Sequence, residues 1–223
     1  MNLFLDETKC RESLFPFTHT RHVADIRIGI LTIREKWEQL TNANVSTDVS
    51  VIKNDTIFVQ ANIIPTKNAL AQILKAAQDE TPVLENEDLK MLQHPWQIFQ
   101  LNDWALRHDF ENLTAKKKSA PISATNQCSN KANIFIEAGA IVEYCSLNAS
   151  TGPVYIGKNA QLMEGSFIRG PFAAGEGSLV KMGSKIYGAT TLGPFCVAGG
   201  EIKNSVLFGY SNKAHDGYLG DSV

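Results

Sequence analysis

Hydrophobic positions in the second part of this chain recur with a period of six residues. Each holds an aliphatic residue or an alanine, and four positions later a second residue follows that is small in six of eight cases. An amphipathic helix places apolar residues at i, i+3, i+4 and i+7, and a half-buried strand alternates, so neither produces this period. The spacing predicts a hexapeptide parallel β-helix. The recurring residues are Ile156, Leu162, Ile168, Ala174, Val180, Ile186, Leu192 and Ala198, and those four positions later are Ala160, Ser166, Phe172, Ser178, Ser184, Thr190, Cys196 and Ile202.

Each hexad is expected to supply one short strand and one corner. The aliphatic residue points into a narrow core, and the small residue fits the tight inner turn. Two earlier hexads, which begin at Ile136 and Val142, keep the register before it slips by two residues at the turn over 151–153. With about three hexads per coil, residues 134–223 predict roughly five coils. Fifteen of the 16 glycines lie in 139–220, where they allow backbone conformations that side chains would obstruct.

The first 80 residues show the mixed patterns of an α/β segment. Runs of β-branched residues indicate strands, and charged runs with helical spacing indicate helices. A polar residue just before an apolar helical run can cap that helix. The expected elements are a strand over 25–33, a helix over 32–40, two strands over 49–58 around an Asn54-Asp55 turn, and a helix from Ala69 to Ala77 capped by Thr66 or Asn68.

Aromatic residues concentrate in the stretch that joins the two patterned parts. Residues 87–113 suit a helical connector that plugs and caps the first coil, because an open β-helix end exposes apolar core and unpaired strand edges. The polar stretch 114–131 is expected to be a loop. We therefore expect a nucleotidyltransferase-like α/β segment over 1–83, a helical connector and loop over 84–131, and a β-helix over 132–223 that is incomplete at its end.

The charge balance gives no reason to expect a polyanionic partner. The formal net charge is −2 and the isoelectric point is about 6.2. We therefore expect neither nucleic acid nor an anionic membrane surface as a partner. The run Lys116-Lys117-Lys118 is interpreted as part of a solvated linker.

The four cysteines show no spacing typical of metal sites or redox motifs. Reduced thiols in a cytoplasmic protein are the expected state. No basic segment followed by an apolar core begins the chain, and no apolar run reaches the length of a membrane span. The sequence predicts a soluble, cytoplasmic protein with no metal site.

The run Leu14-Phe15-Pro16-Phe17-Thr18-His19-Thr20-Arg21 resembles a Leu-x-Pro-Leu-Thr-x-x-Arg stretch near the start of sugar-1-phosphate nucleotidyltransferases. The resemblance implies that Thr18 and Arg21 contribute to nucleotide binding. That family cradles triphosphate with a glycine-rich loop, since backbone N–H groups approach phosphate where side chains are absent. No glycine precedes Gly29 in this chain, so the loop is missing.

Three runs near the end carry a second and more specific resemblance. They are Glu201-Ile202-Lys203-Asn204-Ser205, Ser211-Asn212-Lys213-Ala214-His215 and Tyr218-Leu219-Gly220-Asp221. They are similar to the acetyltransferase β-helix of bifunctional N-acetylglucosamine-1-phosphate uridyltransferase/glucosamine-1-phosphate N-acetyltransferase. More particularly, they resemble the divergent bacterial branch with a shortened N-terminal domain. The resemblance implies a left-handed β-helix and a homotrimer, because this family places its active sites between adjacent chains.

The same resemblance implies roles for five residues. His215 would be the general base that takes a proton from the amino group of glucosamine 1-phosphate, which suits a side chain that titrates near neutrality. Glu201 would orient that histidine or the sugar. Lys203 would hold the sugar phosphate, Tyr218 would hydrogen-bond the same substrate, and Asn204 would add a polar contact.

The implied function is acetyl transfer from acetyl-CoA, as co-substrate, to glucosamine 1-phosphate in the synthesis of UDP-N-acetylglucosamine for the cell envelope. Two alternatives stay open. One is a nucleotidyltransferase for another sugar 1-phosphate, which would need Mg²⁺ and release pyrophosphate; Mg²⁺ is expected only in that case. The other is a non-catalytic assembly module that keeps the β-helix for packing.

Two further observations bear on these alternatives. Arg169, Lys181 and Lys185 project from repeat positions, where they either assist phosphate binding or belong to a solvated face. The chain stops at Val223, in the middle of a hexad, whereas the family continues for several coils that help to bind acetyl-CoA. We therefore expect either a fragment of a longer protein or a loss of those coils.

Overall fold

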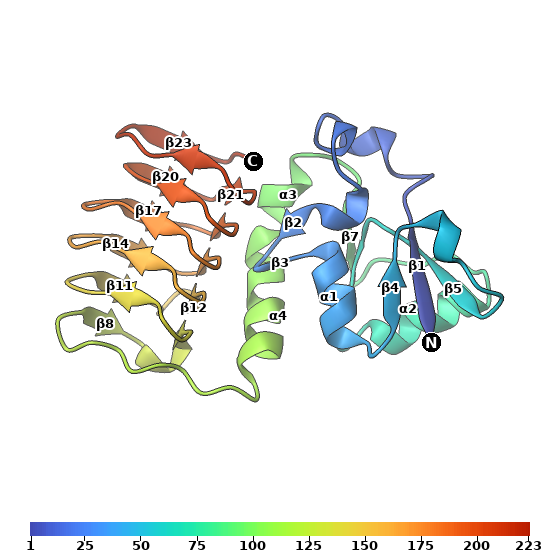
Figure 1. Cartoon of the computed structure of the whole chain (residues 1–223), viewed down its shortest axis with the longest axis horizontal. Coiled ribbons are helices and arrows are strands. Elements are labelled where there is room, and N and C mark those ends of the chain that lie inside the picture. Colours follow the sequence, from blue (N-terminus) through green and yellow to red (C-terminus); the bar gives the residue numbers. More distant parts are fainter. The chain divides into compact units, whose positions relative to one another are not determined.

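A computed structural model describes all residues, 1–223, and the chain divides into two compact units. The first unit comprises Met1–Ile26 and Leu31–Gln97, and the second comprises Arg27–Ile30 and Ile98–Val223. Figure 1 shows the elements of both units in sequence colours. The short segment Arg27–Ile30 therefore belongs with a unit whose other residues begin about 70 positions later.

The first unit is built on a three-stranded parallel sheet in the order β4-β1-β5. Strand β1 (Asn2–Asp6) is central and pairs with β4 (Asn44–Ser46) and β5 (Thr56–Gln60). Helix α1 (Ile33–Leu40) packs near β4, and helix α2 (Leu70–Gln78) packs against β5. The unit also contains η1 (Glu12–Leu14), η2 (Phe17–His19), η3 (Val23–Asp25), β3 (Leu31–Thr32), η4 (Val49–Val51) and the antiparallel pair of β6 (Ile63–Ile64) with β7 (Lys90–Met91).

Both helices predicted in the first unit are confirmed. Helix α1 begins after Thr32, whose side chain accepts the Glu35 amide while the Glu35 carboxylate accepts the Thr32 amide, a complete capping box. At the start of α2 the Thr66 hydroxyl accepts the Ala69 amide at 3.2 Å, so Thr66 performs the predicted cap. Asn68 instead donates to Asp88.

Two strand predictions in the first unit are wrong. Residues 25–33 do not form one strand, because Gly29 adopts φ +73° and interrupts the extended backbone between β2 (Arg27–Ile28) and β3. Residues 49–51 form the 3-10 turn η4 rather than a strand, since the Asp48 side chain accepts the Ser50 amide. Only the second predicted strand of that pair exists, as β5.

The second unit confirms the parallel β-helix, which has about five turns over residues 127–220. Its strands form three parallel sheets. The long sheet contains β8 (Gln127–Ser129), β11 (Ser146–Asn148), β14 (Phe167–Arg169), β17 (Lys185–Tyr187), β20 (Glu201–Lys203) and β23 (Tyr218–Gly220). The helix-facing sheet contains β9 (Ile134–Ile136), β12 (Val154–Ile156), β15 (Phe172–Ala174), β18 (Thr190–Leu192) and β21 (Val206–Leu207). The third sheet contains β10 (Ile141–Val142), β13 (Gln161–Leu162), β16 (Leu179–Val180), β19 (Val197–Ala198) and β22 (Asn212–Lys213).

The hexad residues are buried in the core of the β-helix, as the six-residue period predicts. All eight recurring residues, from Ile156 to Ala198, are at most 2% exposed, and the residues four positions later are equally buried. The register changes after the central coils: Ile168 pairs with Ile186, eighteen positions on, but Ile186 pairs with Ile202, only sixteen positions on. Ile202 therefore occupies a strand position of the long sheet and not the inner-turn position that the period gave it.

The connector is helical as predicted, with α3 (Gln97–Gln100) and α4 (Asn102–Thr114). Its predicted position over the end of the first coil is wrong, because α4 contacts β18, in the fourth coil of the helix-facing sheet. In Figure 1, α4 runs along the side of the stacked coils. Two residues of the next stretch, Ala120 and Ile122, pack against the β-helix core.

The stretch predicted as a loop before residue 132 contains the first strand of the long sheet. Strand β8 pairs with β11, and the 3-10 turn η5 (Lys131–Asn133) leads from it into β9. Its inward residue is Cys128, the register partner of Leu147, and this residue lies before the hexad run, so the sequence period did not reveal the strand. All four cysteines are free thiols, as predicted.

Candidate functional site

Five of the seven candidate residues from the sequence lie in or next to the last two strands of the long sheet. Strands β20 and β23 are parallel neighbours, and their register places Glu201 opposite Tyr218 and Lys203 opposite Gly220. Neighbouring strands lie about 4.8 Å apart. The fold therefore brings Glu201, Lys203 and Tyr218 together, although 15 positions of sequence separate the lysine from the tyrosine.

Side chains on the long sheet form two parallel rows on its outer face. The middle residue of each strand points into the core, as Ile168 and Ile186 do, so the residues that flank it point outward. The first row is Ser146, Phe167, Lys185, Glu201 and Tyr218, and the second row is Asn148, Arg169, Tyr187, Lys203 and Gly220. We call the space between these rows the trough.

The trough is hollowed over β11, β14 and β17, where it forms a pocket of about 540 Å³. Its walls are Ser146, Phe167 and Lys185 on one side and Asn148, Arg169 and Tyr187 on the other. This volume lies within the range of small-molecule sites, which is about 300–1,000 Å³.

Two tyrosine side chains cross the trough, Tyr187 at the end of this pocket and Tyr218 on β23. The Tyr187 hydroxyl of the second row donates to the Glu201 carboxylate of the first row at 2.5 Å. This hydrogen bond, together with the negative charge of Glu201, raises the pKa of Tyr187 above its ordinary value. On β23, one coil after Glu201, the Tyr218 hydroxyl occupies the space that the Cβ atom of a larger residue at Gly220 would need. The carboxylate of Glu201 is thus engaged by Tyr187 rather than by His215.

His215 lies in the turn between β22 and β23 and is exposed. Its main chain is fixed by Lys213, whose ammonium group donates to the carbonyls of Gly199, His215 and Gly217 at 2.7, 2.8 and 2.8 Å. Lys213 occupies the register position that Ala198 holds one coil earlier in the third sheet. Because Lys213 is shifted relative to the family pattern, the resemblance does not imply a role for it.

Asn204 lies at the corner that directly follows β20. Its backbone has φ +46°, and its side-chain amide donates to the Asp221 carboxylate at 2.7 Å. Through this hydrogen bond, the Asn204 side chain connects the corner after β20 to the corner after β23. Its predicted contact with substrate stays a prediction.

The two candidates in the first unit lie in the segment that follows β1. Thr18 is fully buried, and its hydroxyl donates to the Arg11 carbonyl at 2.7 Å. Arg21 is half-buried. Glu7 orders the same segment, since its carboxylate accepts the Val23 amide at 2.9 Å and the Arg11 guanidinium. Burial of the neighbouring His22 lowers the pKa of its imidazole.

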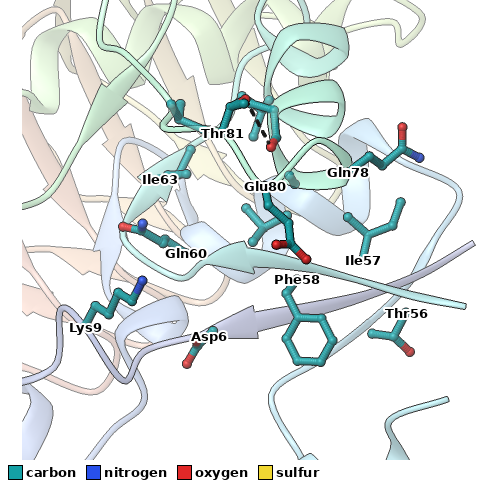
Figure 2. Close-up of a pocket in the computed structure, with 15 residues that line it drawn as sticks. Asp6, Lys9, Thr56, Ile57, Phe58, Gln60, Ile63, Gln78, Glu80 and Thr81 are labelled. Carbon is teal, nitrogen blue, oxygen red and sulfur yellow. Dashed lines mark hydrogen bonds between the residues drawn. The ribbon is translucent and has the colours of Figure 1, made fainter. Parts of the chain in front are cut away.

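The first unit contains a separate pocket of about 650 Å³ along β5 and the end of α2. Figure 2 shows Ile57 and Phe58 on opposite sides of β5, with Glu80 extending over the strand. Asp6 and Lys9, at the carboxyl end of β1, also line this pocket. Neither Thr18 nor Arg21 lines it.

The comparisons with known proteins bear on the first unit. Residues 2–89 match the family model described as sugar nucleotidyl transferase. No curated protein matches the chain. No helix is long and apolar enough to cross a membrane. The combination of a sugar nucleotidyltransferase-like N-terminal segment with a β-helix supports a transferase of nucleotide-sugar metabolism.

The sequence reasoning missed both aromatic residues of the pocket in the trough. Phe167 and Tyr187 lie in strands of the hexad run, but their outward positions carry no period of their own. The available signal was that each stands directly beside a recurring isoleucine, in the runs Phe167-Ile168-Arg169 and Lys185-Ile186-Tyr187. Both runs place an aromatic and a cationic side chain around one buried residue.

Proposed function

We propose that the protein transfers an acetyl group from acetyl-CoA to the amino group of glucosamine 1-phosphate. The observation that carries the proposal is that Glu201, Lys203 and Tyr218 lie side by side on β20 and β23, with His215 in the turn that leads into β23. The nucleotidyltransferase match of residues 2–89 supports the same area of metabolism. The proposal includes a homotrimer, as in the family that the last two coils resemble.

The chemistry requires a base and a cation at separate ends of the sugar. The amino nitrogen attacks the thioester carbonyl, a carbon–nitrogen bond forms, and the carbon–sulfur bond breaks. His215 accepts the proton that the amine loses, and the departing thiolate receives a proton in turn. Lys203 is exposed on the same face and would hold the phosphate. Glu201 would act on the site through Tyr187, to which it is already bonded.

Release of free thiol from acetyl-CoA in the presence of glucosamine 1-phosphate tests this proposal. Replacing the base, His215→Ala, is expected to lower kcat by a hundredfold or more, the scale of general-base catalysis. His94→Ala, at another exposed histidine in the first unit, is the matched control and is expected to leave the rate unchanged. Folded protein without thiol release, or a His215→Ala variant as fast as the control, would contradict the proposal.

A second candidate function is favoured by the first unit. Its residues match the sugar nucleotidyltransferase family model, and a pocket of about 650 Å³ lies within them along β5, with Asp6 of the carboxyl end of β1 in its lining. Ligands of open α/β sheets bind at the carboxyl ends of strands. Release of pyrophosphate from a nucleoside triphosphate and a sugar 1-phosphate, dependent on Mg²⁺, distinguishes this activity from acetyl transfer. Absence of both activities would favour a non-catalytic assembly module.

A further inference from the structure

Strand β5 forms a free edge of the sheet in the first unit. The strand order is β4-β1-β5, so β5 pairs with β1 alone (Figure 1). Proteins usually protect such edges with charged residues, prolines, bulges or a covering segment, but residues 56–60 contain neither charge nor proline. The pocket of about 650 Å³ is lined by all five residues of β5 and by only Asp6 of β1, so the space beside the strand is open.

Main-chain groups on this edge have no partner within the chain. The Ala61 amide donates to the Asp6 carbonyl of β1 at 2.7 Å. Alternate residues of a strand direct their main-chain groups to the same edge, so Thr56, Phe58 and Gln60 face away from β1. The Thr56 amide donates within its own turn, but the N–H of Phe58, the N–H of Gln60 and the carbonyls of all three residues are left open.

These open groups become self-complementary when two copies pair antiparallel. Thr56 and Gln60 lie two positions on either side of Phe58, so a two-fold axis through Phe58 sets Thr56 of one copy opposite Gln60 of the other. Opposite residues whose groups face each other exchange N–H···O=C bonds. Phe58 then bonds to its counterpart in both directions, and the Gln60 amide donates to the Thr56 carbonyl of the other copy. Only groups that the chain leaves open take part.

The side chains of β5 suit the same pairing. Phe58 is 51% exposed and packs on Phe4 of β1, with ring centroids 5.4 Å apart. The axis brings Phe58 of the second copy beside it, and aromatic pairs across strands are stabilising. The polar pair of Thr56 and Gln60 flanks the rings on the same face, because side chains two residues apart point to one face. No like charges come opposite each other.

Charges at the two ends of β5 are also complementary under this symmetry. Lys9 is exposed and forms no ion pair, and the exposed carboxylate of Asp55 accepts only the Asn2 side chain, at 3.0 Å. Lys9 lines the pocket with Gln60, toward the carboxyl end of β5 (Figure 2). Antiparallel pairing brings Asp55 of the second copy to that end, because Asp55 directly precedes Thr56. A second copy therefore supplies the register, the aromatic partner and the opposite charges.

We infer that two copies of the chain pair through β5, antiparallel and centred on Phe58, and join their three-stranded sheets into one continuous sheet. The inference goes beyond acetyl transfer, which assigns no role to β5. It gives the pocket beside this strand a protein occupant in place of a nucleotide.

Sedimentation equilibrium of the full chain over a range of concentrations tests the pairing. Phe58→Lys sets two like charges against each other at the axis and is expected to halve the mass of the assembly. The control is Val49→Lys, at a valine that is 69% exposed in η4 and lies outside the strand, and it is expected to keep the parent mass. Circular dichroism checks that each variant is folded.

Exchange of the two charges tests the register without altering the strand. Lys9→Glu and Asp55→Lys each turn two symmetry-related attractions into repulsions, so each is expected to raise the dissociation constant of the pair about tenfold. The double variant Lys9→Glu/Asp55→Lys restores opposite charges and is expected to pair as the parent does. If Phe58→Lys does not fold, this exchange decides alone.

Three results would overturn the inference. They are a parent mass equal to that of folded Phe58→Lys, an equal loss of mass in Val49→Lys, and a double charge variant that pairs no better than the single variants.

The same masses separate this inference from the homotrimer of the proposed function. A hexamer that becomes a trimer in Phe58→Lys supports both interfaces. A dimer that becomes a monomer supports pairing through β5 and contradicts the trimer, whereas a trimer in both proteins supports the trimer and contradicts the pairing.

Discussion

Lys213 has surroundings that its hexad position does not predict. In the third sheet it is aligned with a row of residues whose side chains point into the core. The earlier members of this row are Val142, Leu162, Val180 and Ala198. A lysine at such a position is tolerated only when its charge finds partners. The three carbonyls of Gly199, His215 and Gly217 accept all three of its donors.

Cys10 makes a pH-dependent contribution to stability. Burial raises the pKa of its thiol from the ordinary 9.0 to about 11. The unfolded thiol therefore ionises first as the pH rises through 9, while the folded protein keeps its proton, so stability present below pH 9 is lost toward pH 11.

Unfolding by denaturant at pH 9 and at pH 11 should reveal this loss. The parent is expected to lose on the order of 2 kcal/mol more than Cys10→Ala over that interval, since one pKa unit corresponds to about 1.4 kcal/mol. If the parent and Cys10→Ala lost equal amounts of unfolding free energy, the Cys10 thiol would have the same pKa in the folded and the unfolded state, which contradicts the prediction.

At the scale of elements, the turn between β22 and β23 depends on Lys213. We predict that Lys213→Met, which keeps the stem of the side chain and removes the donors, loosens this turn. The probe is the Glu201 amide hydrogen, which donates to the Gly217 carbonyl at 3.0 Å. Its exchange with solvent should accelerate tenfold or more, because the Gly217 carbonyl loses its second donor.

The Lys185 amide is the reference for that measurement. It donates to the Gly200 carbonyl at 2.9 Å, one coil before the turn, and should exchange at the parent rate. Lys203→Met, at an exposed lysine of the same coil, is the control variant. Unchanged exchange of the Glu201 amide in Lys213→Met would mean that the turn holds without the lysine.

Helix and strand predictions succeeded where the signal was local. The capping box of Thr32 and Glu35 involves residues three apart, so the sequence displays it directly. The strand over 25–33 failed because Gly29 adopts a positive φ, and its amide donates to Asn102 at 2.8 Å. Because Asn102 is 73 positions away from Gly29, the residues around Gly29 do not reveal this hydrogen bond.

At the scale of the whole molecule, Asn102 joins distant parts of the second unit. Its side-chain oxygen accepts the Gly29 amide and the Thr191 hydroxyl, and its amide group donates to the Ala189 carbonyl. The residue is fully buried. These bonds attach the segment Arg27–Ile30 to helix α4 and to the helix-facing sheet.

Asn102→Ala is expected to destabilise the second unit by about 2 kcal/mol, because the buried Gly29 amide and the buried Ala189 carbonyl lose their partner at about 1 kcal/mol or more each. The Thr191 hydroxyl keeps the Gly29 carbonyl as its acceptor at 3.0 Å. Guanidinium unfolding measures the change. Asn212→Ala, at an exposed asparagine in β22, is expected to stay within about 0.5 kcal/mol of the parent. A similar small effect of Asn102→Ala would contradict the role of this residue as a buried junction.

The β-helix can be predicted from the amino-acid pattern alone, because its core follows a rule that repeats every six residues and each hexad obeys it locally. The sequence also placed Glu201, Lys203, His215 and Tyr218 near one another through a resemblance to a known family. Which outward side chains share the trough is visible only in the folded chain. Coil lengths vary, with 21 residues from Phe167 back to its partner Ser146 but 16 from Lys185 to Glu201. Since a hydrophobic period constrains only the residues that point inward, the alignment of outward residues depends on coil lengths that the period does not specify.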